Sequence, residues 1–224
     1  MDKEEIKKKY IYKIILLGES GTGAKTPLLK RIMTDTFSNS ISSTTGANYA
    51  FLWVQTKIGI IGLEIWDTPG QERYRSLHKV FIKNCHCGIL GYDVTVKQSF
   101  NEIKNYHYDN FKNNSNMDSL IYLVGNKIEM EEREVSEEEG RNYAKEKNMK
   151  FFEISVKERI GIDELLEDIS ISLIQKFKNR ISNDDEDLID YLFENRSIIR
   201  KIKTKEGNNI DNSSKKSSKK CYIF

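Results

Sequence analysis

The sequence contains no run of 18 consecutive apolar residues, so we expect no transmembrane helix. Three cysteines among 224 residues do not form a disulfide framework, which favours a reducing cytosol. With 36 basic and 34 acidic residues the net charge is only +2, and the overall field does not predict nucleic-acid binding. Residues 1–5 lack the apolar segment of a secretion signal, and Asp2 excludes N-myristoylation. The length suits one well-buried α/β core with some residues left over.

Apolar runs with strand composition alternate with helical patterns through most of the chain. Strands are predicted at Tyr10–Leu17, Ala47–Val54, Ile60–Trp66, Cys87–Asp93, Leu120–Gly125 and Phe151–Ile154, and helices at 25–33, 97–112, 136–147 and 162–177. The second and third strands form a predicted hairpin that turns at 56–59. Because strands joined by crossover helices form parallel sheets covered on both faces, we expect an α/β fold with its ligand at the carboxyl ends of the strands.

The most informative segment is an apolar strand that closes on Asp67-Thr68-Pro69-Gly70-Gln71, just before a helical pattern. A carboxylate at a strand tip can hold Mg²⁺ through water, and a glycine N–H can approach the last phosphate of a nucleotide. A glutamine side chain can orient the attacking water. Asp67, Gly70 and Gln71 therefore predict a switch that binds GTP.

A glycine-rich turn follows the first predicted strand and precedes a helix. Backbone N–H groups in such a turn surround phosphate oxygens, helped by the helix dipole. The pattern G-x-x-x-x-G-K-[ST] is broken here by one residue, because Ala24 stands between Gly23 and Lys25. The candidate phosphate-binding residues are Gly18, Ser20, Gly21, Thr22, Gly23, Lys25 and Thr26.

Ala24 permits two registers. In the first, Ala24 is a bulge, and Lys25 and Thr26 keep the phosphate-neutralising and Mg²⁺-binding roles in a distorted cradle. In the second, Ala24 takes the lysine position and Lys25 the hydroxyl position, and the site is damaged. We favour the first register because Lys25 and Thr26 stay adjacent and Pro27 is tolerated in the first turn of a helix.

Five segments in family order resemble the Ras superfamily, most closely its Rab branch. They lie between about residues 10 and 178 and are Gly18–Thr26, Ser43–Gly46, Trp66–Tyr74, Asn126–Glu129 and Ser155–Lys157. The resemblance implies the P-loop small GTPase fold, a six-stranded mostly parallel sheet with one antiparallel strand and helices on both faces. It also implies a cycle between GTP and GDP, with Mg²⁺ as the cofactor.

The resemblance assigns further roles at the phosphate end. Thr44 matches the threonine that binds Mg²⁺ and meets the γ-phosphate, and Asp67 matches the Mg²⁺ carboxylate. Gly70 matches the N–H donor to the γ-phosphate, and Gln71 is the expected catalytic residue that orients water. Ras alone hydrolyses GTP at about 10⁻⁴ s⁻¹. Because no residue is an obvious internal arginine finger, we expect slow hydrolysis without an activating protein.

The base end departs from the family pattern Asn-Lys-x-Asp, because Glu129 replaces the aspartate. A glutamate offers guanine the same pair of acceptors with one extra methylene, so guanine remains the better match than adenine, although some loss of affinity is expected. Ser155-Val156-Lys157 resembles the Ser-Ala-Lys motif that supports the base. The residues implied at this end are Asn126, Lys127, Glu129, Ser155, Val156 and Lys157.

The composition changes after about residue 180, where an acidic cluster is followed by a polar segment rich in Ser, Asn and Lys. We therefore divide the chain into an N-terminal extension (1–9), a GTP-binding domain (10–178), a hypervariable flexible tail (179–220) and a prenylation motif (221–224). The spacing of four apolar residues in the tail is compatible with a short amphipathic helix that binds a partner, and this alternative is left undecided. The residues are Leu188, Leu192, Ile199 and Ile202.

The last residues, Cys221-Tyr222-Ile223-Phe224, fit a C-a-a-X signal for geranylgeranylation of Cys221. Four lysines upstream contribute about 1 kcal/mol each toward an anionic leaflet, which is the second signal that stable anchoring needs. We expect a lipid-anchored protein on the cytoplasmic face of an intracellular or plasma membrane, with a cytosolic pool. Its expected partners are effectors, exchange factors and GTPase-activating proteins, without nucleic acid.

Two functions compete at this point. The first is a slow GTPase that acts as a membrane-anchored switch in vesicle traffic, and the retained Thr44, Asp67, Gly70 and Gln71 favour it. The second is a prenylated scaffold whose altered loops cycle nucleotide weakly or not at all. The Ala24 insertion and the glutamate at the base loop favour the scaffold.

Overall fold

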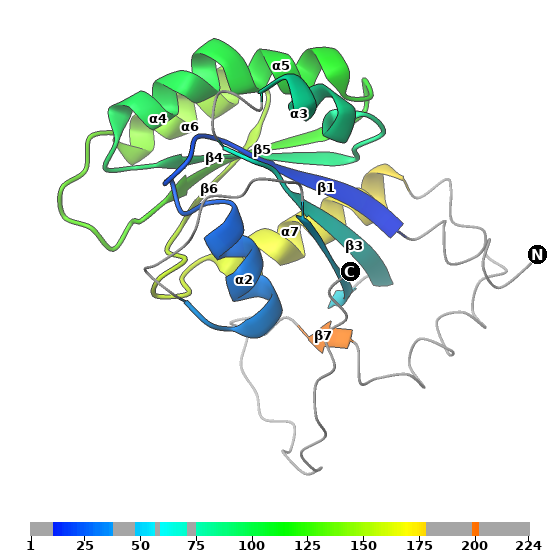
Figure 1. Ribbon diagram of the computed structural model, residues 1–224. Helices are drawn as coiled ribbons and strands as arrows, with labels where there is room; N and C mark the ends of the chain where they lie inside the picture. Colours follow the sequence, from blue (N-terminus) through cyan, green and yellow to red (C-terminus); the bar gives the residue numbers. More distant parts are fainter. Residues whose placement is uncertain (1–10, 38–47, 57–58, 71–74, 178–198, 202–224) are drawn as a thin grey trace, which may run out of the picture.

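The computed structural model describes residues 11–37, 48–56, 59–70, 75–177 and 199–201. A seven-stranded sheet in the order β6-β5-β4-β1-β3-β2-β7 lies between two layers of helices (Figure 1). The strands are β1 (Ile11–Leu17), β2 (Asn48–Thr56), β3 (Gly59–Asp67), β4 (Cys87–Asp93), β5 (Leu120–Asn126), β6 (Lys150–Ile154) and β7 (Ile199–Lys201). Among these strands β2 and β3 pair antiparallel, and the other neighbours pair parallel.

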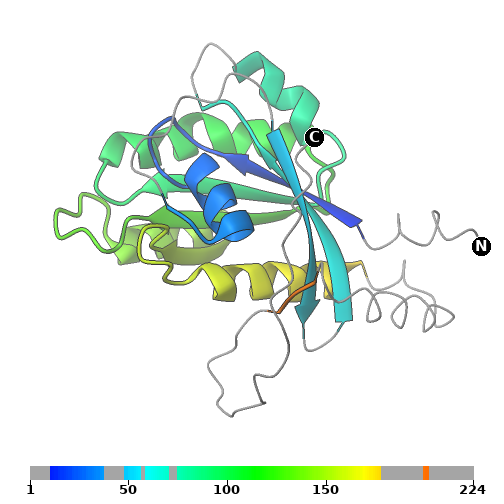
Figure 2. The ribbon, with the colours of Figure 1, turned by 60° about the horizontal axis from the view of Figure 1, so that its bottom comes forward.

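The predicted α/β fold is confirmed, with six strands close to the predicted ranges and one antiparallel pair. The seventh strand was not predicted. It pairs with the outer edge of β2, where Trp53 lies opposite Ile199, and it is drawn in orange in Figure 2. The alternative of a helix in the tail is therefore wrong at Ile199, where strand β7 begins. A strand can form there because the open edge of the sheet offers unpaired backbone groups. Leu188, Leu192 and Ile202 lie outside the described residues.

Helices cover both faces of the sheet, as predicted. They are α2 (Thr26–Thr34), α3 (Arg75–Ile82), α4 (Lys97–Glu102), the π-helix η2 (Ile103–His107), α5 (Tyr108–Asn114), α6 (Glu137–Glu146) and α7 (Ile162–Lys176). Helices α2 and α7 lie on one face and α3 to α6 on the other (Figure 1). None of the described helices is long and apolar enough to cross a membrane.

Strand β1 contributes side chains to the hydrophobic cores on both faces of the sheet. Ile14 and Leu16 pack into the cluster under α2 and α7, and Ile15 and Leu17 pack into the cluster under α4 to α6. Because successive side chains of a strand point to opposite faces, a strand buried on both faces is apolar throughout. This two-sided burial holds the end of β1, and the glycine-rich turn that follows it, at the middle of the sheet.

The predicted helix at 97–112 is one continuous rod of three pieces, α4, η2 and α5. Its central π-helical turn, 103–107, was not predicted. A π turn accommodates one extra residue and shifts the helical phase, so that side chains on either side face directions that a regular helix would not give them. His107, the last residue of this turn, is fully buried.

Candidate functional site

The predicted site residues within the described ranges gather at the carboxyl ends of the strands. The glycine-rich turn follows β1, Thr68 to Gly70 follow β3, Asn126 ends β5, and Ser155 to Lys157 follow β6. In Figure 1 these loops meet where β1, β4 and β5 approach the start of α2. Thr44, Gln71 and Cys221 lie outside the described residues, so their predicted roles stay predictions.

The glycine-rich turn depends on three backbone conformations that favour glycine. Gly18, Gly21 and Gly23 have φ angles of 143°, 83° and 72°. At Gly18 a side chain is also excluded by space, because a Cβ would lie 2.2 Å from the Gly91 carbonyl oxygen. The Thr22 hydroxyl donates to the Glu19 carbonyl at 3.2 Å and closes the turn on itself. A turn of this kind keeps backbone N–H groups available to an anion.

The extra residue Ala24 is fully buried against β4. A Cβ added to Gly91 would lie 2.5 Å from the Cβ of Ala24, so the bulge occupies the space that glycine leaves. Helix α2 then starts after Lys25, with Pro27 in its first turn. This geometry corresponds to the first of the two predicted registers.

Lys25 reaches back into the turn. Its Nζ donates to the carbonyl oxygens of Gly18 at 2.7 Å and Glu19 at 2.5 Å, and its side chain is buried. Burial lowers the pKa of Lys25 to about 8, partly offset by the negative charges of Asp67 and Glu19. Burial disfavours the charged form of a lysine. A negative charge on a ligand beside it favours that charged form and offsets the loss of hydration.

Thr26 and Asp67 meet across the site. The Thr26 hydroxyl donates to Oδ2 of Asp67 at 2.6 Å, and the Thr68 hydroxyl anchors the same strand tip by donating to the Leu16 carbonyl at 2.7 Å. A hydroxyl beside a buried carboxylate is a hard-oxygen set that suits Mg²⁺. The residues present therefore fit this cation.

Gly70 lies against the phosphate loop. A Cβ on Gly70 would be 2.6 Å from Lys25 Nζ and 2.7 Å from the Ser20 backbone nitrogen. A side chain at position 70 would thus fill the space beside the lysine. The absence of one lets the backbone of the β3 loop approach the place where a phosphate would lie.

Asn126 joins the phosphate loop to the base loops. Its Nδ2 donates to the Thr22 carbonyl at 2.9 Å, and its Oδ1 accepts from the Val156 N–H at 3.1 Å. Lys127 has a positive φ of 72°, and its Nζ lies 2.5 Å from Oδ2 of Asp93 at the end of β4. The asparagine therefore acts as a brace between two loops rather than as an isolated polar side chain.

Glu129 carries the clearest sign of a missing partner. Its Oε2 is buried and has no hydrogen-bond partner among the described residues. A buried acceptor without a donor costs about 1–3 kcal/mol, and a ligand that supplies a donor would remove this cost. The N–H groups of a guanine edge are suitable donors for this carboxylate.

The third loop, Ser155 to Lys157, is held from two sides. The Ser155 hydroxyl accepts from the Glu158 N–H at 2.9 Å. Arg31 of α2 donates through Nε to the Val156 carbonyl at 2.8 Å and through Nη2 to the Lys157 carbonyl at 2.6 Å. No local pattern indicated Arg31, because these two partners are backbone carbonyls 125 and 126 positions away in the chain. Asp93 was also missed, although an aspartate that ends a buried strand is a recognisable signal.

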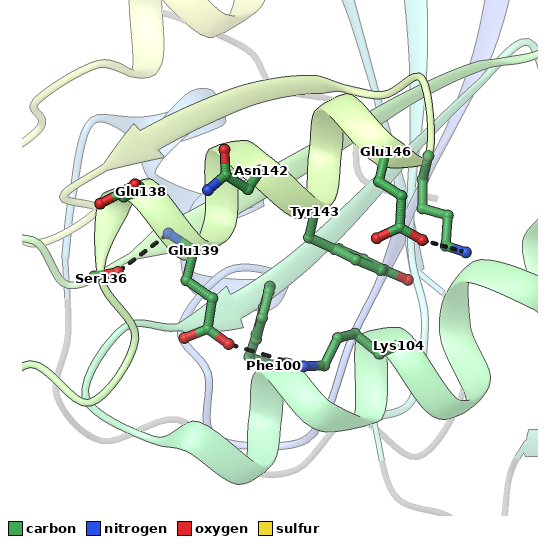
Figure 3. Close-up of a pocket in the computed structure, with 9 residues that line it drawn as sticks. Phe100, Lys104, Ser136, Glu138, Glu139, Asn142, Tyr143 and Glu146 are labelled. Atoms are coloured by element: carbon green, nitrogen blue, oxygen red, sulfur yellow. Dashed lines mark hydrogen bonds and ion pairs between the residues drawn. The ribbon is translucent and has the colours of Figure 1, made fainter.

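A hollow lies away from the strand ends, between the α4–η2 rod and α6 (Figure 3). It has a volume of about 670 Å³ and is lined by Phe100, Lys104, Glu139 and Tyr143 among others. Lys97 and Lys104 both pair with Glu139 across it. These ion pairs join two helices, and none of the predicted site residues lines the hollow.

Comparison with known proteins finds similarity to Ras-related proteins over most of the chain. The Ras family model matches residues 13–175. The Ras-related protein Rab-3B of Bos taurus is 35% identical over 183 residues, which cover 78% of this chain and 80% of that protein. The Ras-related protein Rab-1 of Theileria parva is 35% identical over 175 residues, covering 78% and 79%. The Ras-related protein SEC4 of Candida albicans is 35% identical over 167 residues, covering 74% and 78%.

Proposed function

Because the chain belongs to the Ras family and is a Rab-like GTPase, we propose that the residues described above bind GTP and GDP with Mg²⁺. The observation that carries this proposal is the position of Lys25. Its Nζ sits inside the glycine-rich turn, between the carbonyls of Gly18 and Glu19, despite the Ala24 insertion. A lysine in that place neutralises the β- and γ-phosphates of a nucleotide.

The other groups follow from this placement. Thr26 and Asp67, joined at 2.6 Å, would hold Mg²⁺ directly and through water, and the cation supplies charge neutralisation for the phosphates. The Gly70 backbone lies beside Lys25 and would donate its N–H to the γ-phosphate. Gln71 would orient the attacking water, and Thr44 would complete the cation site.

Guanine recognition is assigned to Glu129, braced by the Asn126 network. Its buried Oε2 would accept from the guanine N–H groups, which remove the cost of burying an unpaired acceptor. Adenine presents an acceptor in place of the N1 donor and would repel the carboxylate. Guanine should therefore be preferred even with a glutamate at this position.

We also propose that the protein is a membrane-anchored switch in vesicle traffic, with effectors, exchange factors and activating proteins as partners. Cys221 with its upstream lysines is the proposed anchor, and the relatives named Rab-3B, Rab-1 and SEC4 support this class of role. Incorporation of a labelled geranylgeranyl group in the wild type, and its loss in Cys221→Ser, tests the anchor independently of nucleotide binding.

The deciding experiment is titration of fluorescent GTP and GDP, with and without Mg²⁺, against the wild type and Lys25→Ala. Nanomolar, Mg²⁺-dependent binding that is lost in Lys25→Ala supports the proposal. Lys30→Ala is the matched control, because Lys30 lies on the helix that follows Lys25 and has an exposed side chain. Weak binding that is indifferent to Lys25 would refute the site and support the prenylated scaffold.

A further inference from the structure

Two of the three histidines of the chain are buried where α3 faces the α4–η2–α5 rod, beside the phosphate loop. His107 ends the π-helical turn η2, and His78 lies on α3, which follows the β3 loop. Their rings are 6.0 Å apart between centroids, at an interplanar angle of 32°. Neither belongs to the predicted site, yet each contacts a different loop of it.

His107 contacts the phosphate loop. Its Nε2 lies 3.4 Å from Oε1 of Glu19, the residue whose carbonyl oxygen accepts a hydrogen bond from Lys25. The carboxylate of Glu19 also stabilises the charge of Lys25. A movement of Glu19 would therefore change its contacts with both Lys25 and His107.

His78 contacts the loop after β3. Its Nε2 lies 2.9 Å from the Pro69 carbonyl oxygen, immediately before Gly70. Because a carbonyl only accepts, Nε2 must carry the proton in this hydrogen bond. His78 thus fixes the residue that precedes the proposed γ-phosphate donor.

We propose that His107 and His78 are positioning residues that couple the phosphate loop to the Pro69–Gly70 loop. The two loops flank the same point, since a Cβ on Gly70 would lie 2.6 Å from Lys25 Nζ. The histidine pair forms a second connection between them, behind the phosphate site. This inference rests on the proposed function, because Gly70 matters only if a γ-phosphate lies beside Lys25.

The π-helical turn is the structural basis of this coupling. It shifts the phase of the rod at 103–107 and places a long polar side chain at a fully buried position. Ordinary core packing needs neither a histidine there nor its contact with a carboxylate. Coupled elements with two arrangements are what transmit a ligand's presence between loops.

The first test is a double-mutant cycle of His107→Gln and Glu19→Gln, measured by single-turnover GTP hydrolysis and by GTP and GDP dissociation. Each single substitution should change hydrolysis or GTP dissociation by about 5-fold, and the double variant by little more than one alone. His86→Gln is the matched control, because His86 is half-buried at the opposite end of β1, where its Nδ1 accepts from the Lys13 N–H. Additive effects that are equal for GTP and GDP would overturn the coupling and leave a packing role.

The second test needs no substitution. Ring ¹⁵N shifts of His78 and His107 should differ between protein loaded with GDP and protein loaded with a non-hydrolysable GTP analogue, while those of His86 stay constant. Identical shifts in the two states would overturn the inference even if guanine nucleotides bind tightly. Failure of the proposed function is a different result, namely the absence of Lys25-dependent nucleotide binding.

Discussion

Replacement of Gly91 by alanine tests whether the Ala24 bulge is packed as the structure shows. The new Cβ would lie 2.5 Å from the Cβ of Ala24, more than 1 Å inside ordinary contact. Overpacking of this kind costs about 1–3 kcal/mol, and both atoms belong to buried backbone segments with little room to move. We expect Gly91→Ala to lower the free energy of unfolding by about 2 kcal/mol and to accelerate GDP release.

The same substitution should be nearly neutral when Ala24 is glycine. Without the Ala24 Cβ, the nearest atoms to the new Cβ are the carbonyl oxygen and Cα of residue 24, at 3.5 and 3.6 Å, which is ordinary contact. Ala24→Gly by itself loses about 0.8 kcal/mol of methyl burial and about 0.5–1 kcal/mol of backbone entropy. Urea unfolding of the wild type, the two single variants and the double variant should give an interaction free energy of about 2 kcal/mol. An equal cost of Gly91→Ala in both backgrounds would refute the bulge register.

Three further predictions follow from contacts of the site and core. Arg31→Ala removes three charge-assisted bonds to the backbone carbonyls of Asp35, Val156 and Lys157, so it should cost about 2 kcal/mol in urea unfolding, whereas the exposed Arg141→Ala should be neutral. Burial raises the pKa of Cys85 to about 12, so in a Cys221→Ser variant both remaining thiols should resist a disulfide reagent at pH 8 until the protein unfolds, and native labelling would contradict this. Chelation of Mg²⁺ should accelerate GDP release, and an unchanged rate would exclude the cation from the site.

The raised pKa of Cys85 also has a defined effect on stability. The folded thiol keeps its proton up to about pH 12, whereas the unfolded thiol ionises near 9.0. Between these values the folded state binds more protons, so the free energy of unfolding should fall as the pH rises from 9 to 12. Cys85→Ala should reduce this dependence, measured by urea unfolding at several pH values.

The strands and the site segments could be predicted because both depend on short-range patterns. A strand buried on two faces must be largely apolar, as β4 is from Cys87 to Tyr92, before the aspartate that ends it. The carboxyl ends of parallel strands share one edge, so Gly18, Asp67 and Asn126 were expected to lie there. In the structure the loop that begins at Gly18 bonds to Asp67 through Thr26 and to Asn126 through Thr22.

The adjacency of Lys25 and Thr26 favoured the register that the structure shows, but the sequence did not indicate why the extra residue fits. Ala24 occupies space that is left by a glycine 67 positions later in the chain. The π-helical turn was missed since its period differs little from that of an α-helix over five residues. Strand β7 was missed because a three-residue strand forms only where an open edge is near, and Ile199 alone carries no sign of that edge.

The sequence by itself determined the fold class, the order of the elements and the chemical types at the site, because periodicity and turn residues act over a few neighbouring positions. Only the tertiary structure decided that Lys25 points back into the glycine-rich turn and that Arg31 binds the carbonyls of the Ser155–Lys157 loop. It also decided that two histidines are buried beside the loops of the site. Each of these depends on atoms far apart in the chain that are close only after the sheet has formed. Such contacts leave no local pattern in the sequence.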